Sequence, residues 1–98
     1  MAAKLRLTLA CGDYEIIRAL KEGTVEADGI ELNVLTSMDS SSRHWRMLRN
    51  EEFDVCELSG SSFLIAKDRG YSFTAIPIFL HRRFRHGFIF INKEKGIE

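Results

Sequence analysis

The sequence has 98 residues, which is enough for one small domain. Hydrophobic residues make up 45% of it and charged residues 29%, as in an ordinary globular protein, and the formal net charge is zero. This neutral balance argues against a general electrostatic grip on nucleic acid or on an acidic membrane surface. No apolar run approaches the ~20 residues that a membrane-spanning helix needs.

The first residues lead directly into an alternating strand pattern, without the apolar region and cleavage site of a signal peptide. We therefore expect a cytoplasmic protein. The two cysteines, Cys11 and Cys56, lack the C-x-x-C spacing of a zinc site, and a structural disulfide is unusual in the cytoplasm. Both are expected to be buried free thiols near strand ends.

The first half of the chain predicts two strands joined by a helix. Residues 5–10 and 30–35 alternate apolar and polar side chains, which is typical of half-buried strands. Ile16, Ile17 and Leu20 recur between them at helical spacing, and Gly23 stands where a helix C-terminal glycine belongs. A turn is expected at Asp28-Gly29, just before the second strand.

The second half predicts two further helices and three further strands. A polar stretch, 37–42, offers N-caps for a helix that carries Trp45 and Leu48, and a short helix with Phe63 and Leu64 ends near Gly70. These apolar side chains are expected to pack on the sheet. The predicted strands cover residues 53–58, 73–80, where Pro77 interrupts the pattern, and 88–91.

The alternation of strands and helices predicts an α/β fold with a mostly parallel sheet of about five strands and helices on both faces. The last strand follows the fourth after a short loop, so it is expected to run antiparallel to its neighbour.

Small and polar residues gather in the loops that follow the predicted strands. In a parallel sheet these loops share one edge, where free N–H groups of the helix starts favour anions. Asp13, Ser42 and Ser61 can act there as N-caps alone, or as caps that also line a site. Glu57, at the end of the third strand, is either a ligand group or a solvated strand end. The loop residues singled out are Gly12, Asp13, Ser59, Gly60, Ser61 and Ser62.

Residues 81–87 hold three arginines and two histidines in a neutral protein. Arginine binds carboxylates with two parallel hydrogen bonds, and histidine transfers protons near neutral pH. A solvated basic hairpin is the plain alternative, and a nucleic-acid loop is disfavoured because no wider basic stripe accompanies it. A metal ion held by Asp13, Glu57, His81 and His86 is open, although no ligand spacing demands it.

Taken together, these residues resemble the opening of the 4,5-dihydroxyphthalate decarboxylase family. The run Arg83-Phe84-Arg85-His86, with the preceding Ile76-Pro77, is the most specific part of the resemblance. The runs that carry it are 7–14, 29–32, 45–48, 52–55, 57–59, 75–79, 83–86 and 89–92.

The resemblance implies a fold like that of type II periplasmic binding proteins, with two lobes around a cleft. Residues 1–98 would be the N-terminal part of lobe 1, with the second lobe and the return segment absent. Such a lobe exposes sheet edge and apolar surface, which makes a homo-oligomer possible. The implied partner is a small aromatic carboxylate, with neither nucleic acid nor membrane and without a cofactor.

The implied reaction removes carbon dioxide from a dihydroxylated aromatic dicarboxylate. We expect His86 to protonate the ring carbon, and Asp13 or Glu57 to share the proton of a ring hydroxyl. The alternatives are a solute-binding protein without catalysis and a regulatory relative that binds another aromatic acid. The expected substrate-binding residues are Gly12, Tyr14, Ser59, Ser61, Ser62, Arg83 and Arg85.

Overall fold

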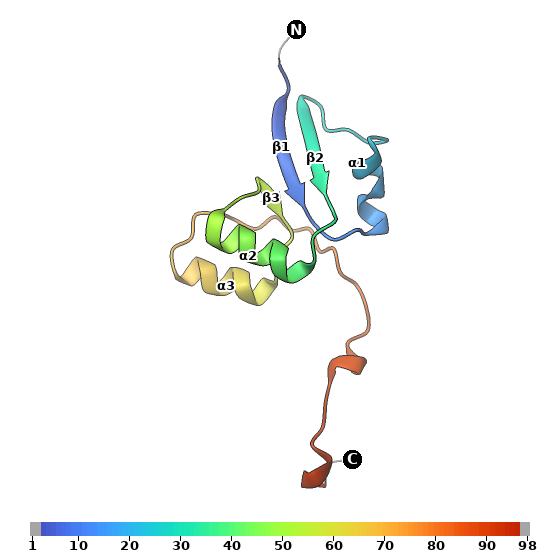
Figure 1. The fold of residues 1–98 in the computed structure, drawn as a ribbon, viewed down its shortest axis with the longest axis vertical. Coiled ribbons are helices and arrows are strands. Elements are labelled where there is room, and N and C mark those ends of the chain that lie inside the picture. Colours follow the sequence, from blue (N-terminus) through green and yellow to red (C-terminus); the bar gives the residue numbers. More distant parts are fainter. Residues whose placement is uncertain (1–2, 97–98) are drawn as a thin grey trace.

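The computed structural model describes residues 3–96. Its centre is a parallel sheet of three strands in the order β2-β1-β3 (Figure 1). Strands β1 (Leu5–Ala10) and β2 (Ile30–Leu35) pair along their whole length, from Leu5 opposite Ile30 to Ala10 opposite Leu35. Strand β3 (Val55–Cys56) pairs only with the last two residues of β1. The α/β class and the two opening strands are therefore confirmed, while the third strand is shorter than the predicted 53–58.

Helices follow each strand, as the alternation predicted. A 310 helix, η1 (Glu15–Ile17), leads into α1 (Arg18–Glu22), which ends at Gly23 in the left-handed conformation that favours glycine. Two longer helices are α2 (Ser40–Asn50) and α3 (Gly60–Asp68), and both are seen below β3 in Figure 1. Two 310 helices, η2 (His86–Phe88) and η3 (Lys93–Lys95), lie near the C-terminus.

The N-cap of α2 lies within the polar stretch 37–42 that was predicted to supply it. It is Asp39, not Ser42, and its carboxylate accepts a 3.1 Å hydrogen bond from the backbone N–H of Ser42. The caps of η1 and α3 are Tyr14 and Ser59 rather than Asp13 and Ser61, so these two helices begin within one or two residues of the expected positions.

A small core lies between the sheet and α2. Ala10, Met47 and Phe53 are buried together, and the half-buried side chains of Leu35, Met38, Cys56 and Phe73 pack against them. Trp45 and Leu64, which were expected to pack on the sheet, are 59% and 68% exposed. That expectation was wrong because a sheet of three strands is too narrow to cover the outer faces of α2 and α3.

Residues 73–80 and 88–91 do not form the fourth and fifth strands that their apolar pattern predicted. A strand needs a neighbour to pair its backbone groups, and β3 offers a free edge of only two residues. Phe73 packs against the core and Leu80 is half-buried, but Ile76, Ile78 and Phe79 are exposed, as is every residue from 81 to 96.

The part of the chain after Phe73, residues 74–96, is the C-terminal segment, and it extends away from the sheet and makes the molecule elongated (Figure 1). The principal dimensions of the molecule are 69 × 33 × 22 Å, and the radius of gyration of the molecule is 17.4 Å. A compact domain of this size has a radius of gyration of about 13 Å. Among residues 3–96, no helix has both the length and the apolar character that crossing a bilayer requires. The two-lobed fold stays a prediction.

Candidate functional site

The loops that follow the three strands meet at one edge of the sheet, which we call the rim and define as residues 11–14, 36–43 and 57–62. Backbone hydrogen bonds hold its parts together. The N–H of Cys11 donates to the carbonyl of Leu35 at 3.1 Å, and the N–H of Glu57 donates to the carbonyl of Ala10 at 2.9 Å. Because the strands are parallel, the residues after β1 and β3 become neighbours although more than forty positions separate them.

A buried ion pair organises the rim. Arg43, in the first turn of α2, has only 4% of its side chain exposed, and its Nη2 lies 2.5 Å from Oε1 of Glu57, whose side chain is 16% exposed. A second guanidinium nitrogen, Nη1, donates to the carbonyl of Met38 at 3.2 Å. Two charges in such surroundings are stable only when they remain paired and hydrogen-bonded. Arg43 therefore fixes the position of the Glu57 carboxylate.

Sequence analysis missed Arg43, because an arginine among polar serines looks like part of a solvated helix start. One signal was present. Arg43 precedes Met47 by four residues, so the two side chains share one face of the helix. Both are buried in the structure. A charged residue in line with the apolar face of a helix is a candidate for a buried partner on the neighbouring strand.

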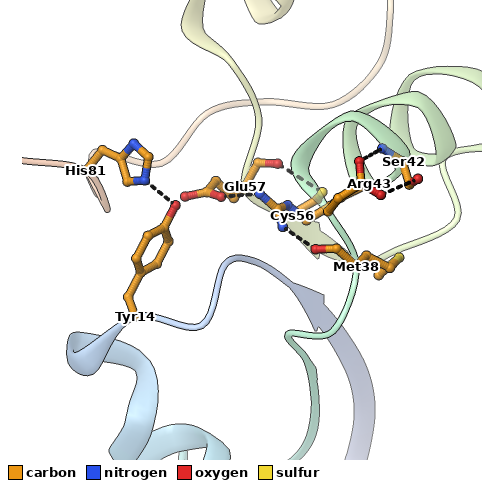
Figure 2. A network of polar contacts seen from close by, with 8 residues as sticks. Tyr14, Met38, Ser42, Arg43, Cys56, Glu57 and His81 are labelled. Atoms are coloured by element: carbon orange, nitrogen blue, oxygen red, sulfur yellow. Dashed lines mark hydrogen bonds and ion pairs between the residues drawn. The ribbon is translucent and has the colours of Figure 1, made fainter. Parts of the chain in front are cut away.

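Tyr14 joins this ion pair to the C-terminal segment. Its hydroxyl oxygen lies 2.6 Å from Nε2 of His81, and the two rings meet edge to face with centroids 5.0 Å apart. Figure 2 shows the Tyr14 hydroxyl between His81 and the Glu57 carboxylate, which in turn meets Arg43. Burial, together with a hydrogen bond to the Glu57 carboxylate and its charge, raises the pKa of Tyr14 to about 12.

Gly12 leaves the space that the Tyr14 ring occupies. The backbone N–H of Tyr14 donates to the carbonyl of Gly12 at 3.0 Å, which turns the chain tightly. A Cβ atom at position 12 would lie 2.6 Å from Cζ of Tyr14. The absence of a side chain at Gly12 is therefore what allows the phenol to fold back toward Glu57.

The other rim residues supply small polar groups. The hydroxyl oxygens of Ser59 and Ser61 lie 3.0 Å apart at the start of α3, and Ser62 lies in the first turn of this helix. Asp13 forms a 3.2 Å ion pair with Lys21 on the exposed side of the loop. The Arg43–Glu57 and Asp13–Lys21 pairs each balance their charges, and Asp39 adds one negative charge at the start of α2.

Beyond His81, the basic residues of the C-terminal segment contact aromatic rings of that same segment. The guanidinium groups of Arg83 and Arg85 lie 5.0 and 5.7 Å from the ring centroid of Phe88, and the ring of His86 lies 6.1 Å from that of Phe84. Figure 1 shows this part of the chain leading away from the sheet. Among the candidate residues, the structure brings Tyr14 beside Glu57, and Ser59 beside Ser61.

Both cysteines are free, as expected, with Cys11 buried and Cys56 half-buried. Burial, together with the neighbouring Glu57 charge, raises the pKa of Cys11, and burial raises the pKa of Cys56 to about 11. Thiols with such pKa values stay protonated and are poor nucleophiles and metal ligands. Within residues 3–96, no three histidine, cysteine or acidic side chains are grouped so as to hold a metal ion.

Comparison with known proteins confirms the resemblance. The chain is 38% identical over 96 residues to a 4,5-dihydroxyphthalate decarboxylase of Pseudomonas putida, a match that covers 97% of the chain and 37% of the relative. It is 35% identical over 96 residues to a protein of the same name from Comamonas testosteroni, covering 97% of the chain and 29% of the relative. The chain thus spans about a third of the length of these curated relatives. No protein-family model matches it.

Proposed function

We propose, from the similarity of nearly the whole chain to two 4,5-dihydroxyphthalate decarboxylases, that it is part of a decarboxylase for a dihydroxylated aromatic dicarboxylate. This similarity is the observation that carries the proposal. The product would be a dihydroxybenzoate of the protocatechuate type. The rim would form one half of the substrate cleft, and a second lobe would form the other half.

The start of α3 suits one carboxylate of such a substrate. The hydroxyls of Ser59 and Ser61 lie together there, and the free N–H groups of the first helical turn add a positive dipole end. Hydroxyl and backbone donors bind a carboxylate without adding a fixed charge. Arg83 and Arg85 are proposed to hold the second carboxylate once the C-terminal segment lies over the cleft.

Glu57 and Asp13 are the proposed acceptors for the proton of a ring hydroxyl. A hydroxyl para to the departing carboxylate increases the electron density at the ring carbon that must be protonated. Partial removal of its proton by a carboxylate strengthens this effect. Glu57 is better placed than Asp13, because Arg43 fixes it at the rim while the Asp13 side chain is 66% exposed and paired with Lys21.

The apolar character of the C-terminal segment supports the proposal of a longer protein. Phe79, Phe84 and Phe90 are each 87% exposed. Apolar side chains concentrated in this way mark a surface that another part of a protein covers. In the proposed complete enzyme, the chain beyond this lobe covers these phenylalanines and holds Arg83 and Arg85 near the rim.

The test is to supply 4,5-dihydroxyphthalate to the natural full-length gene product and to measure released carbon dioxide together with the aromatic product. We expect one molecule of each per substrate consumed, with the same activity before and after treatment with a metal chelator. Saturable binding without carbon dioxide would contradict the proposal and favour a solute-binding protein. Activity lost on chelation and restored by a divalent ion would instead show a metal requirement.

A further inference from the structure

We propose that His81 is the residue that protonates the ring carbon in this reaction, and that Arg43, Glu57 and Tyr14 form a positioning chain that holds its imidazole. The inference rests on the proposed function and assigns a group within it. His81 approaches the rim from the C-terminal segment and contacts Tyr14, which lies in the loop between β1 and η1.

The direction of each hydrogen bond in this chain follows from the chemistry of its members. The Arg43 guanidinium has donors only, so Glu57 accepts from it. A carboxylate accepts further bonds, and the Tyr14 hydroxyl lies beside the Glu57 carboxylate (Figure 2), to which we assign its single proton. With this assignment the oxygen of Tyr14 is an acceptor toward Nε2 of His81 at 2.6 Å. The inferred tautomer of His81 carries its hydrogen on Nε2.

This arrangement leaves the opposite edge of the imidazole for chemistry. With Nε2–H directed at Tyr14, Nδ1 is the nitrogen that gains and loses a proton. His81 is exposed, so this edge is open to a ligand at the rim. The edge-to-face contact with the Tyr14 ring fixes the plane of the imidazole as well as its position. Hydrogen-bonded partners behind a functional histidine orient it in the same way in metal sites and catalytic triads.

His81 is a better candidate than His86 on geometric grounds. The ring of His86 packs against Phe84 of its own segment, so even with this segment over the cleft its described contacts do not orient the imidazole at the rim. His81 instead contacts Tyr14 directly and, through it, Glu57. An acid and the carboxylate that shares the hydroxyl proton must reach the same aromatic ring, and His81 and Glu57 lie on one row of contacts (Figure 2).

The proposed step balances in atoms and charge. The imidazolium of His81 transfers its Nδ1 proton to the ring carbon that bears the departing carboxylate, while Glu57 draws on the proton of the para hydroxyl. The bond from this carbon to the carboxylate then breaks, carbon dioxide leaves, and the electron pair restores the aromatic ring. The hydroxyl recovers its proton, and the neutral imidazole takes a new one from water.

The experiment compares wild type, His81→Gln and His86→Gln in the natural full-length protein. We expect His81→Gln to lower kcat about 10²–10⁴-fold, the usual contribution of a general acid, with KM changed less than about threefold. The loss in His86→Gln is expected to be smaller. If wild type is active, an unchanged kcat in His81→Gln overturns the assignment of His81 but not the proposed function. A larger loss of kcat in His86→Gln than in His81→Gln does the same. A wild type that releases no carbon dioxide overturns the proposed function as well.

A second measurement tests the positioning chain without reference to activity. Nitrogen-15 NMR of the His81 ring in its neutral form distinguishes the two tautomers. We expect Nε2–H in wild type and a mixture of tautomers in Tyr14→Phe, which lacks the accepting oxygen but keeps the ring. A wild-type imidazole with its hydrogen on Nδ1, or a Tyr14→Phe spectrum unchanged from wild type, overturns the chain of hydrogen bonds.

Discussion

Arg43 and Glu57 form an ion pair across the helix α2 and the end of β3, with 4% and 16% of their side chains exposed. The side chains of the other ion pairs among residues 3–96 are all at least 36% exposed. Arg43 holds the Glu57 carboxylate in place, and that carboxylate in turn raises the pKa of the Tyr14 hydroxyl.

Replacing Arg43 is expected to cost far more stability than replacing an exposed arginine. Arg43→Met leaves the Glu57 carboxylate partly buried without its counter-charge, which typically costs about 3–5 kcal/mol. The matched control is Arg6→Met, which breaks the pair of Arg6 with Glu31, whose side chains are 86% and 60% exposed. There we expect a change of about 1 kcal/mol or less. Urea denaturation measures both, and equal losses would contradict a structural role for the buried pair.

The hydroxyl of Tyr14 provides a pH-dependent probe of the rim. Its pKa of about 12 lies above the ordinary value of 10, because burial and Glu57 both disfavour the phenolate. Glu57→Gln removes the charge and is expected to move the pKa of Tyr14 down toward 10, without reaching it while the ring stays partly buried. Absorbance near 295 nm follows the ionisation, with Tyr14→Phe as the blank that isolates this phenol from Tyr71.

The same shift fixes a pH window for stability. The unfolded chain loses the Tyr14 proton near pH 10, whereas the folded protein holds it until about pH 12. The stabilisation is therefore complete below pH 10 and disappears as the pH rises to 12. Between these values the free energy of unfolding should fall more steeply in wild type than in Tyr14→Phe. Parallel curves for the two proteins would show that Tyr14 has its ordinary pKa.

Phe53 and Phe90 test the difference in packing between the core and the C-terminal segment. Phe53 is 5% exposed and packs beside Met47, whereas Phe90 is 87% exposed. Phe53→Ala is expected to lower the free energy of unfolding by about 3–5 kcal/mol. Phe90→Ala should change it by less than about 0.5 kcal/mol and should reduce self-association seen by light scattering. A large loss of stability in Phe90→Ala would show that the segment packs on the sheet in this chain.

The local sequence pattern was sufficient to predict some elements. Apolar and polar side chains alternate regularly in residues 5–10 and 30–35, which predicts strands, and Gly23 ends its helix as glycine commonly does. The convergence of Tyr14 and Glu57 followed from the parallel order alone. Residues 73–80 carry as good a strand pattern, but a strand exists only beside a partner, and that partner is a property of the whole fold.

The central ion pair was harder to predict for a related reason. Burial of Arg43 depends on how α2 lies against the sheet, and the sign of it in the sequence is that Arg43 shares a helix face with Met47. The expected roles of Arg83 and Arg85 remain predictions, since they concern a cleft with a second half, and our proposal gives the role first expected of His86 to His81.

The most direct test of the rim as the binding site is a titration of the natural full-length protein with phthalate, a substrate-like dicarboxylate without the ring hydroxyls. Amide NMR signals are followed residue by residue. We predict saturable shifts centred on Gly12, Tyr14, Ser59 and Ser61. Shifts confined to the other end of the sheet, near Lys4 and Glu31, or no saturable shift at all, would contradict the account.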